Sequence, residues 1–422
     1  MTTTVIGRLG SANTYDNALR NLSERQGALS ALQENLSSGK RVNRASDDPT
    51  ATAQSERAQT RIARIATEQR ALAAQRNTVA LTESTLGDAT ATLQNFRDLL
   101  VSSGNATFSP KERESIVAQM RLLRDQLLGQ ANRSDTNGLP LFSGLGSIAS
   151  PFVQTASGVV YNGIGGQQSS SDVNIPLTAD GQAAFMNVPT GNGVFTVALG
   201  TNAITAGPNL GHAFTDVGAV INPSLAAAQG YDYTIAFSVV GGVTTYTTTN
   251  NTNASITSGP YVPGQPVVLG GLQVTVRGIP ANGDRLQIAP STTTGPGSGL
   301  FGALDSAIAG MLSTSPASVG AGANSADASL NQAIARGLAE VDTAMNRLQA
   351  VRAQSGSLLN RADSIDDIQN RNNIQLEADR SRAEDLDMVK GISDFQNQQT
   401  AYEAALKSYA SVQKLSLFNY IS

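Results

Sequence analysis

Apolar residues recur every seven positions near the start of the chain, which predicts a helix with a single apolar stripe. The stripe consists of Tyr15, Leu22, Leu29 and Leu36, with Ala18 and Leu32 at intervening positions. A seven-residue repeat is typical of coiled coils, because it keeps one face of the helix against a partner helix. Ser37-Ser38-Gly39 is expected to end this helix, since glycine readily adopts the left-handed conformation common at helix C-termini.

A second seven-residue series follows and predicts a helix of about fifty residues, or about 75 Å. Its members are Ile65, Leu72, Val79, Leu86, Leu93 and Leu100. Asp48 is a suitable N-cap, and Pro49 suits the first helical position because an N–H group is not needed there. Ser109-Pro110-Lys111-Glu112 has the pattern of a capping box and predicts the start of a third helix.

Helical periodicity returns at about Leu330 and continues to the end of the chain. The last helix carries apolar residues at three-, four- and seven-residue spacings, and these are Ile392, Phe395, Tyr402, Leu406, Tyr409, Leu415, Leu417 and Phe418. Each terminal helix has one apolar stripe that it cannot bury alone, so helices from the two chain ends are expected to pair. A helical pair encloses little volume. The stripes could therefore form an intramolecular seam or a surface shared with neighbouring subunits.

The middle of the chain has a different composition. Residues 143–300 contain 25 of the 40 glycines and only seven charged residues. Two hairpins are predicted there, one turning at Gly241-Gly242 and the other at Gly270-Gly271, because alternating strand-like segments flank each glycine pair. The fold class expected is α+β, mainly α: a long antiparallel helical bundle or coiled coil from both chain ends, with a β-rich domain inserted in the middle.

This pattern suggests five segments along the chain. Residues 1–45 form an N-terminal coiled-coil helix with its connecting turn, and residues 46–142 form N-terminal rod helices. Residues 143–300 form the inserted β-rich outer domain. Residues 301–382 form C-terminal rod helices, and residues 383–422 form a C-terminal coiled-coil helix.

Composition narrows the possible chemistry. The 29 basic and 33 acidic residues give a net charge of -4, whereas nucleic-acid binding usually requires a basic excess. With no cysteine and a single histidine, thiolate or multi-histidine metal sites are excluded. We therefore expect no catalytic, cofactor-binding or metal-binding residues. No apolar run is long enough for a membrane span, and the first residues lack the pattern of an ordinary secretory signal.

Four segments resemble one family. LSSGKRVNRASDDPTATAQ, at residues 36–54, resembles the signature of the flagellin superfamily. Its Ser46-Asp47-Asp48-Pro49 form is closer to the hook–filament junction proteins of that superfamily than to flagellin itself. ANRSDTNGLPLFSG, GIPANGDRLQIAPS and the terminal QQTAYEAALKSYASVQKLSLFNYI are similar to further segments of the family. The resemblance covers both helical flanks and only the edges of the central domain.

The resemblance implies a structural protein without catalysis that joins the hook-side junction ring to the flagellar filament and lets flagellin assemble distally. It implies a place outside the cell, reached through the flagellar type III export apparatus. The implied partners are hook-associated protein 1, flagellin, copies of the chain itself in a ring, the export apparatus and an export chaperone. The two terminal stripes would then be subunit interfaces.

Two other functions stay open. A flagellin or minor filament subunit would share the fold but polymerise on itself. A cell-surface adhesin with a coiled-coil stalk and a β-rich binding domain would be expected to carry a secretory signal or an anchor. An enzyme is the weakest alternative, since no acid, base and nucleophile occur together in the sequence.

Overall fold

The computed structural model describes residues 11–104, 110–294, 298–312 and 323–421. The chain divides into two compact units, one formed by residues 1–71 with 365–422 and the other by residues 72–364. Two long helices, α2 (Pro49–Ser103) and α6 (Ala323–Glu384), contribute residues to both units. The protein is mainly helical with an antiparallel β region inserted between the helical ends, as the sequence predicts.

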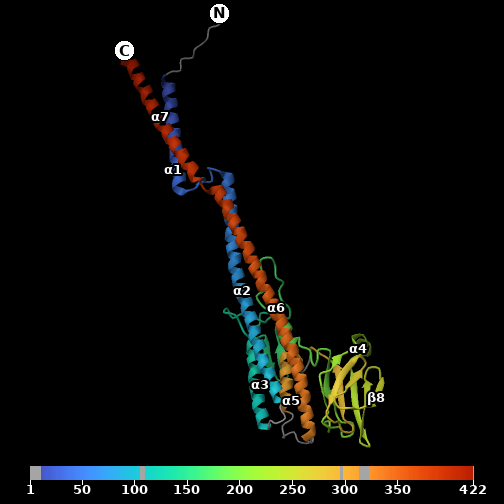
Figure 1. Ribbon diagram of the computed structural model, residues 1–422. Helices are drawn as coiled ribbons and strands as arrows, with labels where there is room; N and C mark the ends of the chain where they lie inside the picture. The colour runs from blue at the N-terminus through green and yellow to red at the C-terminus, as the bar shows by residue number, and fades with distance from the viewer. Residues whose placement is uncertain (1–10, 105–109, 295–297, 313–322, 422) are drawn as a thin grey trace. The chain divides into compact units, whose positions relative to one another are not determined.

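In the first unit, helices from the two ends of the chain lie side by side. They are α1 (Ser11–Ser38) and α7 (Met388–Ile421), and Figure 1 shows them paired along their lengths. The Leu386 N–H, just before α7, donates to the Gly39 carbonyl, just after α1, over 2.9 Å, so the two helices run antiparallel. Gly39 has φ +70°, the left-handed conformation expected where α1 ends.

The same unit contains the start of α2 and the end of α6. These segments also run antiparallel, with Gln69 Nε2 donating to Asn370 Oδ1 over 2.7 Å. The prediction that helices from opposite chain ends pair is confirmed for both α1 with α7 and α2 with α6. In the described residues, no helix is apolar over enough of its length to cross a membrane.

The second unit has a helical core built on the predicted long repeat. Leu86, Leu93 and Leu100 are fully buried, and Leu72 and Val79 are nearly so. Leu86, Leu93 and Leu100 pack with α3 (Pro110–Ala131), α5 (Gly299–Leu312) and the first half of α6. Helix α3 begins at the proline of the predicted capping box, whereas Ser109 lies outside the described residues.

The β region of this unit contains a small hairpin and two larger antiparallel sheets. The hairpin is formed by β1 (Phe152–Thr155) and β2 (Gly158–Tyr161). The order in the five-stranded sheet is β3 (Phe195–Leu199), β11 (Arg285–Pro290), β6 (Tyr233–Val240), β7 (Val243–Asn250) and β8 (Ile256–Pro260). The other sheet contains β4 (Phe214–Thr215), β10 (Leu272–Arg277), β5 (Ala219–Val220) and β9 (Pro266–Leu269).

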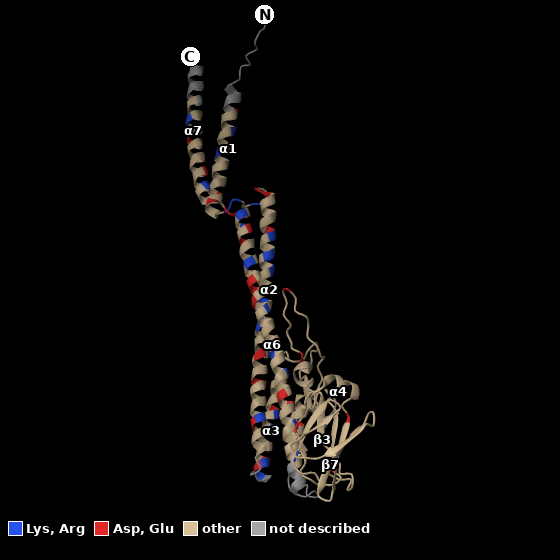
Figure 2. Ribbon diagram, turned by 45° about the vertical axis from the view of Figure 1, so that its right-hand side comes forward, with Lys and Arg blue, Asp and Glu red and all other residues tan. Residues whose placement is uncertain are grey.

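Both predicted hairpins are present. Val240 pairs with Val243 across Gly241-Gly242, and Leu269 pairs with Leu272 across Gly270-Gly271. Alternate residues of β6 and β10 point into one shared apolar core, as the period of two in a strand requires. Figure 2 shows that charged residues are frequent along the helices and sparse on the strands.

Two short helical segments of the β region were not predicted. A π-helical turn spans Gln182–Met186, and α4 spans Pro223–Gln229. The Asn222 side chain caps α4 by accepting the Leu225 N–H over 3.1 Å. Phe185, in the π-helical turn, packs among Phe142, Phe152 and Phe301 and belongs to the helical core.

Candidate assembly site

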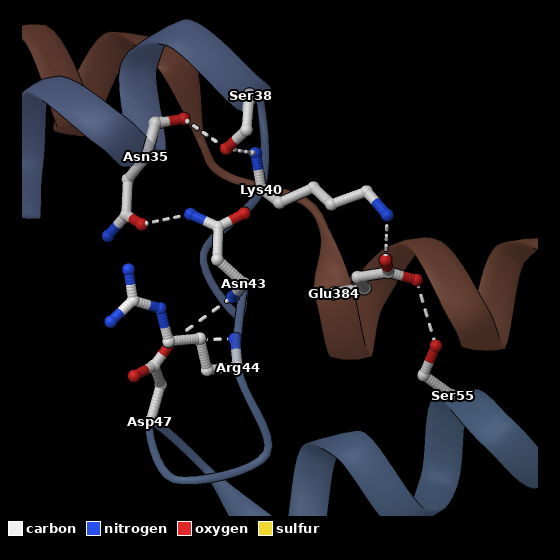
Figure 3. A network of polar contacts seen from close by, with 8 residues as sticks. All are labelled: Asn35, Ser38, Lys40, Asn43, Arg44, Asp47, Ser55 and Glu384. Atoms are coloured by element: carbon white, nitrogen blue, oxygen red, sulfur yellow. Dashed lines mark hydrogen bonds and ion pairs between the residues drawn. The ribbon is translucent and has the colours of Figure 1, made fainter.

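The predicted family motif, Ser46-Asp47-Asp48-Pro49, forms the turn between α1 and α2. Asp47 closes this turn, because its Oδ2 accepts the N–H groups of Asn43 over 3.2 Å and Arg44 over 2.8 Å (Figure 3). Ser46 is exposed, and its hydroxyl lies 3.5 Å from Asp47 Oδ1. The motif therefore fixes the path of the chain between two helices.

Asp48 is the N-cap of α2, as predicted. Its Oδ1 accepts the N–H groups of Thr50 over 3.1 Å and Ala51 over 3.0 Å, while Pro49 takes the first helical position. These are the N–H groups that a helix leaves unsatisfied at its start. The Ala51 N–H is the largest cause of a lowered pKa for Asp48, and Arg41, whose guanidinium lies 3.2 Å from Asp48 Oδ2, lowers that pKa further.

Two residues that flank this turn contact a carboxylate at the end of α6, which is distant in the sequence. Lys40 forms an ion pair with Glu384 Oε1, and the Ser55 hydroxyl donates to Glu384 Oε2 over 2.8 Å (Figure 3). The Lys40 contact is the largest cause of a lowered pKa for Glu384, followed by the Ser55 hydrogen bond. We call Lys40, Ser55 and Glu384 the clamp.

Backbone contacts reinforce the clamp. The Arg41 N–H donates to the Glu384 carbonyl over 2.8 Å, and the Arg41 guanidinium donates to the Ala383 carbonyl over 2.8 Å. Beneath these bonds Val42, Ala51 and Ala383 form a small buried apolar cluster. The turn after α1 and the turn before α7 are thus held as one piece.

Helix α7 starts beside the clamp and passes close to α1. Asp387 caps it, its Oδ1 accepting the N–H groups of Val389 over 3.1 Å and Lys390 over 3.2 Å. A Cβ at Gly391 would lie 2.8 Å from Leu386 Cδ2 and 3.2 Å from Leu36 Cδ2. Glycine at this position therefore allows the close approach of α7 to the predicted interface residue Leu36.

The predicted interface residues are only partly buried in the single chain. Those with partly buried side chains are Leu22, Leu29, Leu36, Phe395, Tyr402 and Tyr409. Ile392 and Leu406 remain 46% and 40% exposed. The side chains of Tyr15, in α1, and of Leu415, Leu417 and Phe418, in α7, lie outside the described residues.

This incomplete burial distinguishes the α1–α7 pair from the rest of the helices. Between residues 16–38 and 388–411, no described apolar side chain is fully buried, whereas Leu86 and Leu93 of α2 are completely inaccessible. Apolar surface left half-covered on a helical pair can still be removed from water by a partner. The α1–α7 pair, with the clamp at its base, is the candidate assembly site.

Most of the polar residues that build this site are not predicted by any pattern in the sequence. Lys40, Ser55 and Glu384 have no local signal, because their contact exists only once both chain ends have paired. Asp387, directly before an apolar helical segment, does carry a recognisable N-cap signal. Among the described residues, no group of three or more acidic or histidine side chains is placed to hold a metal ion.

Comparison with known proteins identifies relatives of both helical flanks. Residues 11–147 match the bacterial flagellin N-terminal helical region, and residues 338–421 match the bacterial flagellin C-terminal helical region. Together these regions cover just over half of the chain.

Two relatives are hook-associated proteins. Flagellar hook-associated protein 3 of Escherichia coli K12 is 26% identical over 419 residues, which covers 97% of this chain and 98% of that protein. Flagellar hook-associated protein 3 of Salmonella typhimurium LT2 is 34% identical over 159 residues, which covers 37% of this chain and 49% of that protein. The Salmonella alignment therefore spans about half the length of its relative.

Solved structures show the same fold. The flagellar junction protein FlgL from Legionella pneumophila matches with a TM-score of 0.65 and 25% identity, covering 73% of this chain and 99% of that chain. FlgL from Xanthomonas campestris matches with a TM-score of 0.62 and 25% identity, covering 71% of this chain and 93% of that chain.

Proposed function

Because the chain belongs to the flagellin superfamily and is similar over nearly its full length to hook-associated protein 3, we propose that it joins the hook side of the bacterial flagellum to the filament. In this role it lets flagellin assemble beyond it and performs no catalysis. The known relatives are structural flagellar proteins, which supports this assignment.

The observation that carries the proposal is the half-covered apolar surface of the α1–α7 pair. In a monomer, leaving this apolar surface in water costs free energy. An adjacent subunit that covers the surface removes it from water and is therefore stabilising. Contacts between unlike faces of successive subunits need not close, so they can continue along a tube. The predicted interface residues on α1 and α7 are the surface that we assign to this contact.

The partners proposed are hook-associated protein 1 on one side, flagellin on the other, and copies of this chain in a ring. Export through the flagellar type III apparatus, with an export chaperone, would bring the protein outside the cell. Within the chain we assign residues 143–300 to an outer domain and the terminal segments 1–45 and 383–422 to the assembly contacts.

A gene deletion in the source bacterium tests this proposal. Cells would be examined by electron microscopy, and flagellin would be measured in the growth medium. The proposal expects hooks without filaments, together with flagellin shed into the medium. Filaments of normal length and number would contradict it.

A second candidate is a flagellin or minor filament subunit. The match to the flagellar filament 41 kDa core protein of Borreliella burgdorferi, 32% identical over 168 residues, favours it. The same deletion distinguishes these functions. Loss of a minor filament subunit would shorten or alter filaments without leaving bare hooks, and loss of the flagellin itself would leave bare hooks with no flagellin in the medium.

A further inference from the structure

Asparagine is followed directly by glycine at four positions of this chain, which are Asn137-Gly138, Asn162-Gly163, Asn192-Gly193 and Asn282-Gly283. Asparagine is one of the chemically labile residues. A following glycine increases this lability, because a residue without Cβ leaves its backbone nitrogen free to approach the asparagine side chain. The four pairs have the same local chemistry, so the folded structure decides which of them can react.

Three of the pairs hold the backbone nitrogen that would react. In each of them the glycine N–H donates to a backbone carbonyl: Gly138 to Asp135 over 3.1 Å, Gly193 to Thr190 over 3.4 Å and Gly283 to Phe237 over 2.9 Å. A bonded N–H of this kind must be released by local opening of the structure before its nitrogen can attack the side chain.

Two of these pairs also hold the asparagine side chain. Asn192 Nδ2 donates to the Val217 carbonyl over 3.1 Å, and its Oδ1 accepts the Phe195 N–H over 2.9 Å. Asn282 Oδ1 accepts the Val239 N–H over 3.1 Å. These amide groups are therefore fixed in orientations set by the fold.

The pair Asn162-Gly163, directly after β2, is not held in this way. Asn162 is exposed, and its side chain forms no hydrogen bond with the part of the chain that the structure describes. Within the same residues the Gly163 N–H has no hydrogen-bond acceptor. The backbone N–H of Asn162 donates to the Pro151 carbonyl over 2.7 Å, which leaves the side chain free to turn.

Packing explains why glycine follows Asn162. A Cβ at Gly163 would clash with the Tyr161 side chain and would lie 2.8 Å from the Ser143 carbonyl oxygen. The fold therefore requires glycine here, although glycine makes the preceding asparagine labile.

We propose that Asn162 is a site of spontaneous deamidation in the folded protein. The Gly163 nitrogen attacks the side-chain carbonyl carbon of Asn162, and the new C–N bond closes a succinimide ring. The side-chain nitrogen leaves as ammonia and takes up the proton that Gly163 loses. Water then adds to either carbonyl of the ring and opens it, which gives aspartate or isoaspartate at position 162. Water is the only co-reactant.

Either product adds a negative charge to a region with few charged residues. Isoaspartate also lengthens the backbone, because the side-chain Cβ becomes part of the main chain. The backbone of Ile164 is paired nearby, its N–H donating to the Ser143 carbonyl over 3.3 Å and its carbonyl accepting the Leu145 N–H over 2.9 Å. Isoaspartate at position 162 is expected to weaken this pairing.

Timed incubation of the purified full-length protein at mildly alkaline pH tests the proposal. Samples would be digested with chymotrypsin, because no lysine or arginine lies between Arg133 and Arg277 and trypsin would leave three of the pairs on one fragment. Mass spectrometry measures the conversion of amide to acid at each pair, and protein isoaspartyl methyltransferase labels isoaspartate. Conversion at Asn162 is expected to be at least about tenfold faster than at Asn192 or Asn282, since those pairs react only after local opening.

The same incubation in urea is the matched control, because it keeps the sequence and removes the fold. The rates at the four pairs should then lie within about threefold of one another. In the folded protein, Asn162→Gln should abolish the fast conversion and leave the other pairs unchanged.

A second variant tests the protection given by a bonded nitrogen. Asp135 Oδ1 accepts the N–H groups of Asn137 and Leu139 over 2.8 Å each, in the turn where the Asp135 carbonyl accepts the Gly138 N–H. Asp135→Ala removes the two side-chain bonds and loosens this turn. Conversion at Asn137 should then increase by about fivefold, while the rate at Asn162 stays the same.

Two results would overturn the inference. One is conversion at Asn162 no faster than at Asn192 or Asn282 in the folded protein. The other is an equal spread of rates in urea, which would show that the local sequence and not the fold selects the site. Neither result bears on the proposed function, which the gene deletion tests separately.

Discussion

Lys40 and Glu384 form an ion pair although 344 positions separate them in the sequence. The contact joins the turn after α1 to the last residue of α6, so it can form only when the two chain ends have come together. Glu384 also accepts from Ser55 at the start of α2. One carboxylate thereby connects three helical segments at the base of the α1–α7 pair.

Replacing Glu384 by glutamine removes this charge while keeping the shape of the side chain. We expect the free energy of local opening at the turns 39–48 and 385–387 to fall by about 1 kcal/mol, because the Lys40 ion pair is lost at a partly exposed site. Hydrogen exchange followed by mass spectrometry would show this as about fivefold faster exchange at both turns. Asp394→Asn, at an exposed position of α7, is the control and should leave exchange unchanged.

Acidification is expected to open the same turns. The pKa values of Asp48 and Glu384 are both lowered in the folded chain, from ordinary values of 3.8 and 4.5. The folded state therefore binds fewer protons than the unfolded state at these two carboxylates. The stability that they contribute is complete when the pH is above their ordinary pKa values, and it is lost as the pH falls through their lowered pKa values in the folded chain. Hydrogen exchange, corrected for intrinsic exchange rates, should show that residues 39–51 open more often as the pH falls from about 5 to about 3.

The variant Glu384→Gln supplies the check on this pH dependence. It lacks one of the two titrating carboxylates and should show a weaker increase over the same pH range. An equal pH response in the variant and the wild type would mean that Glu384 does not stabilise the turn.

Gly391 permits the close approach of α7 to α1. Glycine in a helix interior is ordinarily less stable than alanine by about 0.5–1 kcal/mol. Gly391→Ala is not expected to gain this stability, because its Cβ would lie 2.8 Å from Leu386 Cδ2 and 3.2 Å from Leu36 Cδ2. Gly27→Ala in α1, where no heavy atom lies within 4 Å, should gain it.

Urea unfolding of the two alanine variants, followed by circular dichroism, measures this difference. A Gly391→Ala variant stabilised as much as Gly27→Ala would show that α7 does not need to approach Leu36 closely.

Gln332 attaches the β region to α6 within the second unit. Its Oε1 accepts the Thr215 N–H over 2.8 Å and the Thr215 hydroxyl over 3.0 Å, and its Nε2 donates to the Val197 carbonyl over 3.1 Å. Gln332→Ala would leave buried polar groups unpaired, so we expect the free energy of unfolding to fall by about 2 kcal/mol. Gln349→Ala, at an exposed position of α6, should change it by less than about 0.5 kcal/mol.

The thermal unfolding midpoint, measured by calorimetry, would detect the loss. Gln332→Ala and Gln349→Ala with the same midpoint would indicate that the β region is held on α6 by other contacts.

Much of the helical framework could be predicted from the sequence because it depends on local patterns. The seven-residue repeat placed Leu86, Leu93 and Leu100 in the interior, and Asp48-Pro49 marked the start of α2, since capping involves residues only a few positions apart. The turns at Gly241-Gly242 and Gly270-Gly271 were likewise visible, because a hairpin needs a short pair of permissive residues.

The remaining features depend on residues that meet only in the folded chain. Strands β4 and β5 contain two residues each, too few for a periodic pattern, and they exist because β10 lies beside them. The clamp brings the turn after α1 and the start of α2 together with the end of α6. No spacing rule connects Lys40 with Glu384.

The measurement that tests the account most directly is complementation of the deletion with Leu29→Asp. Leu29 lies on the partly buried stripe of α1, where a carboxylate would oppose the removal of apolar surface from water by α7 and by a neighbouring subunit. We expect the variant to be exported with a folded β region and to leave bare hooks, whereas Gln33→Asp, at an exposed position of α1, is expected to restore filaments. Normal filaments with Leu29→Asp would contradict the claim that this apolar stripe drives assembly.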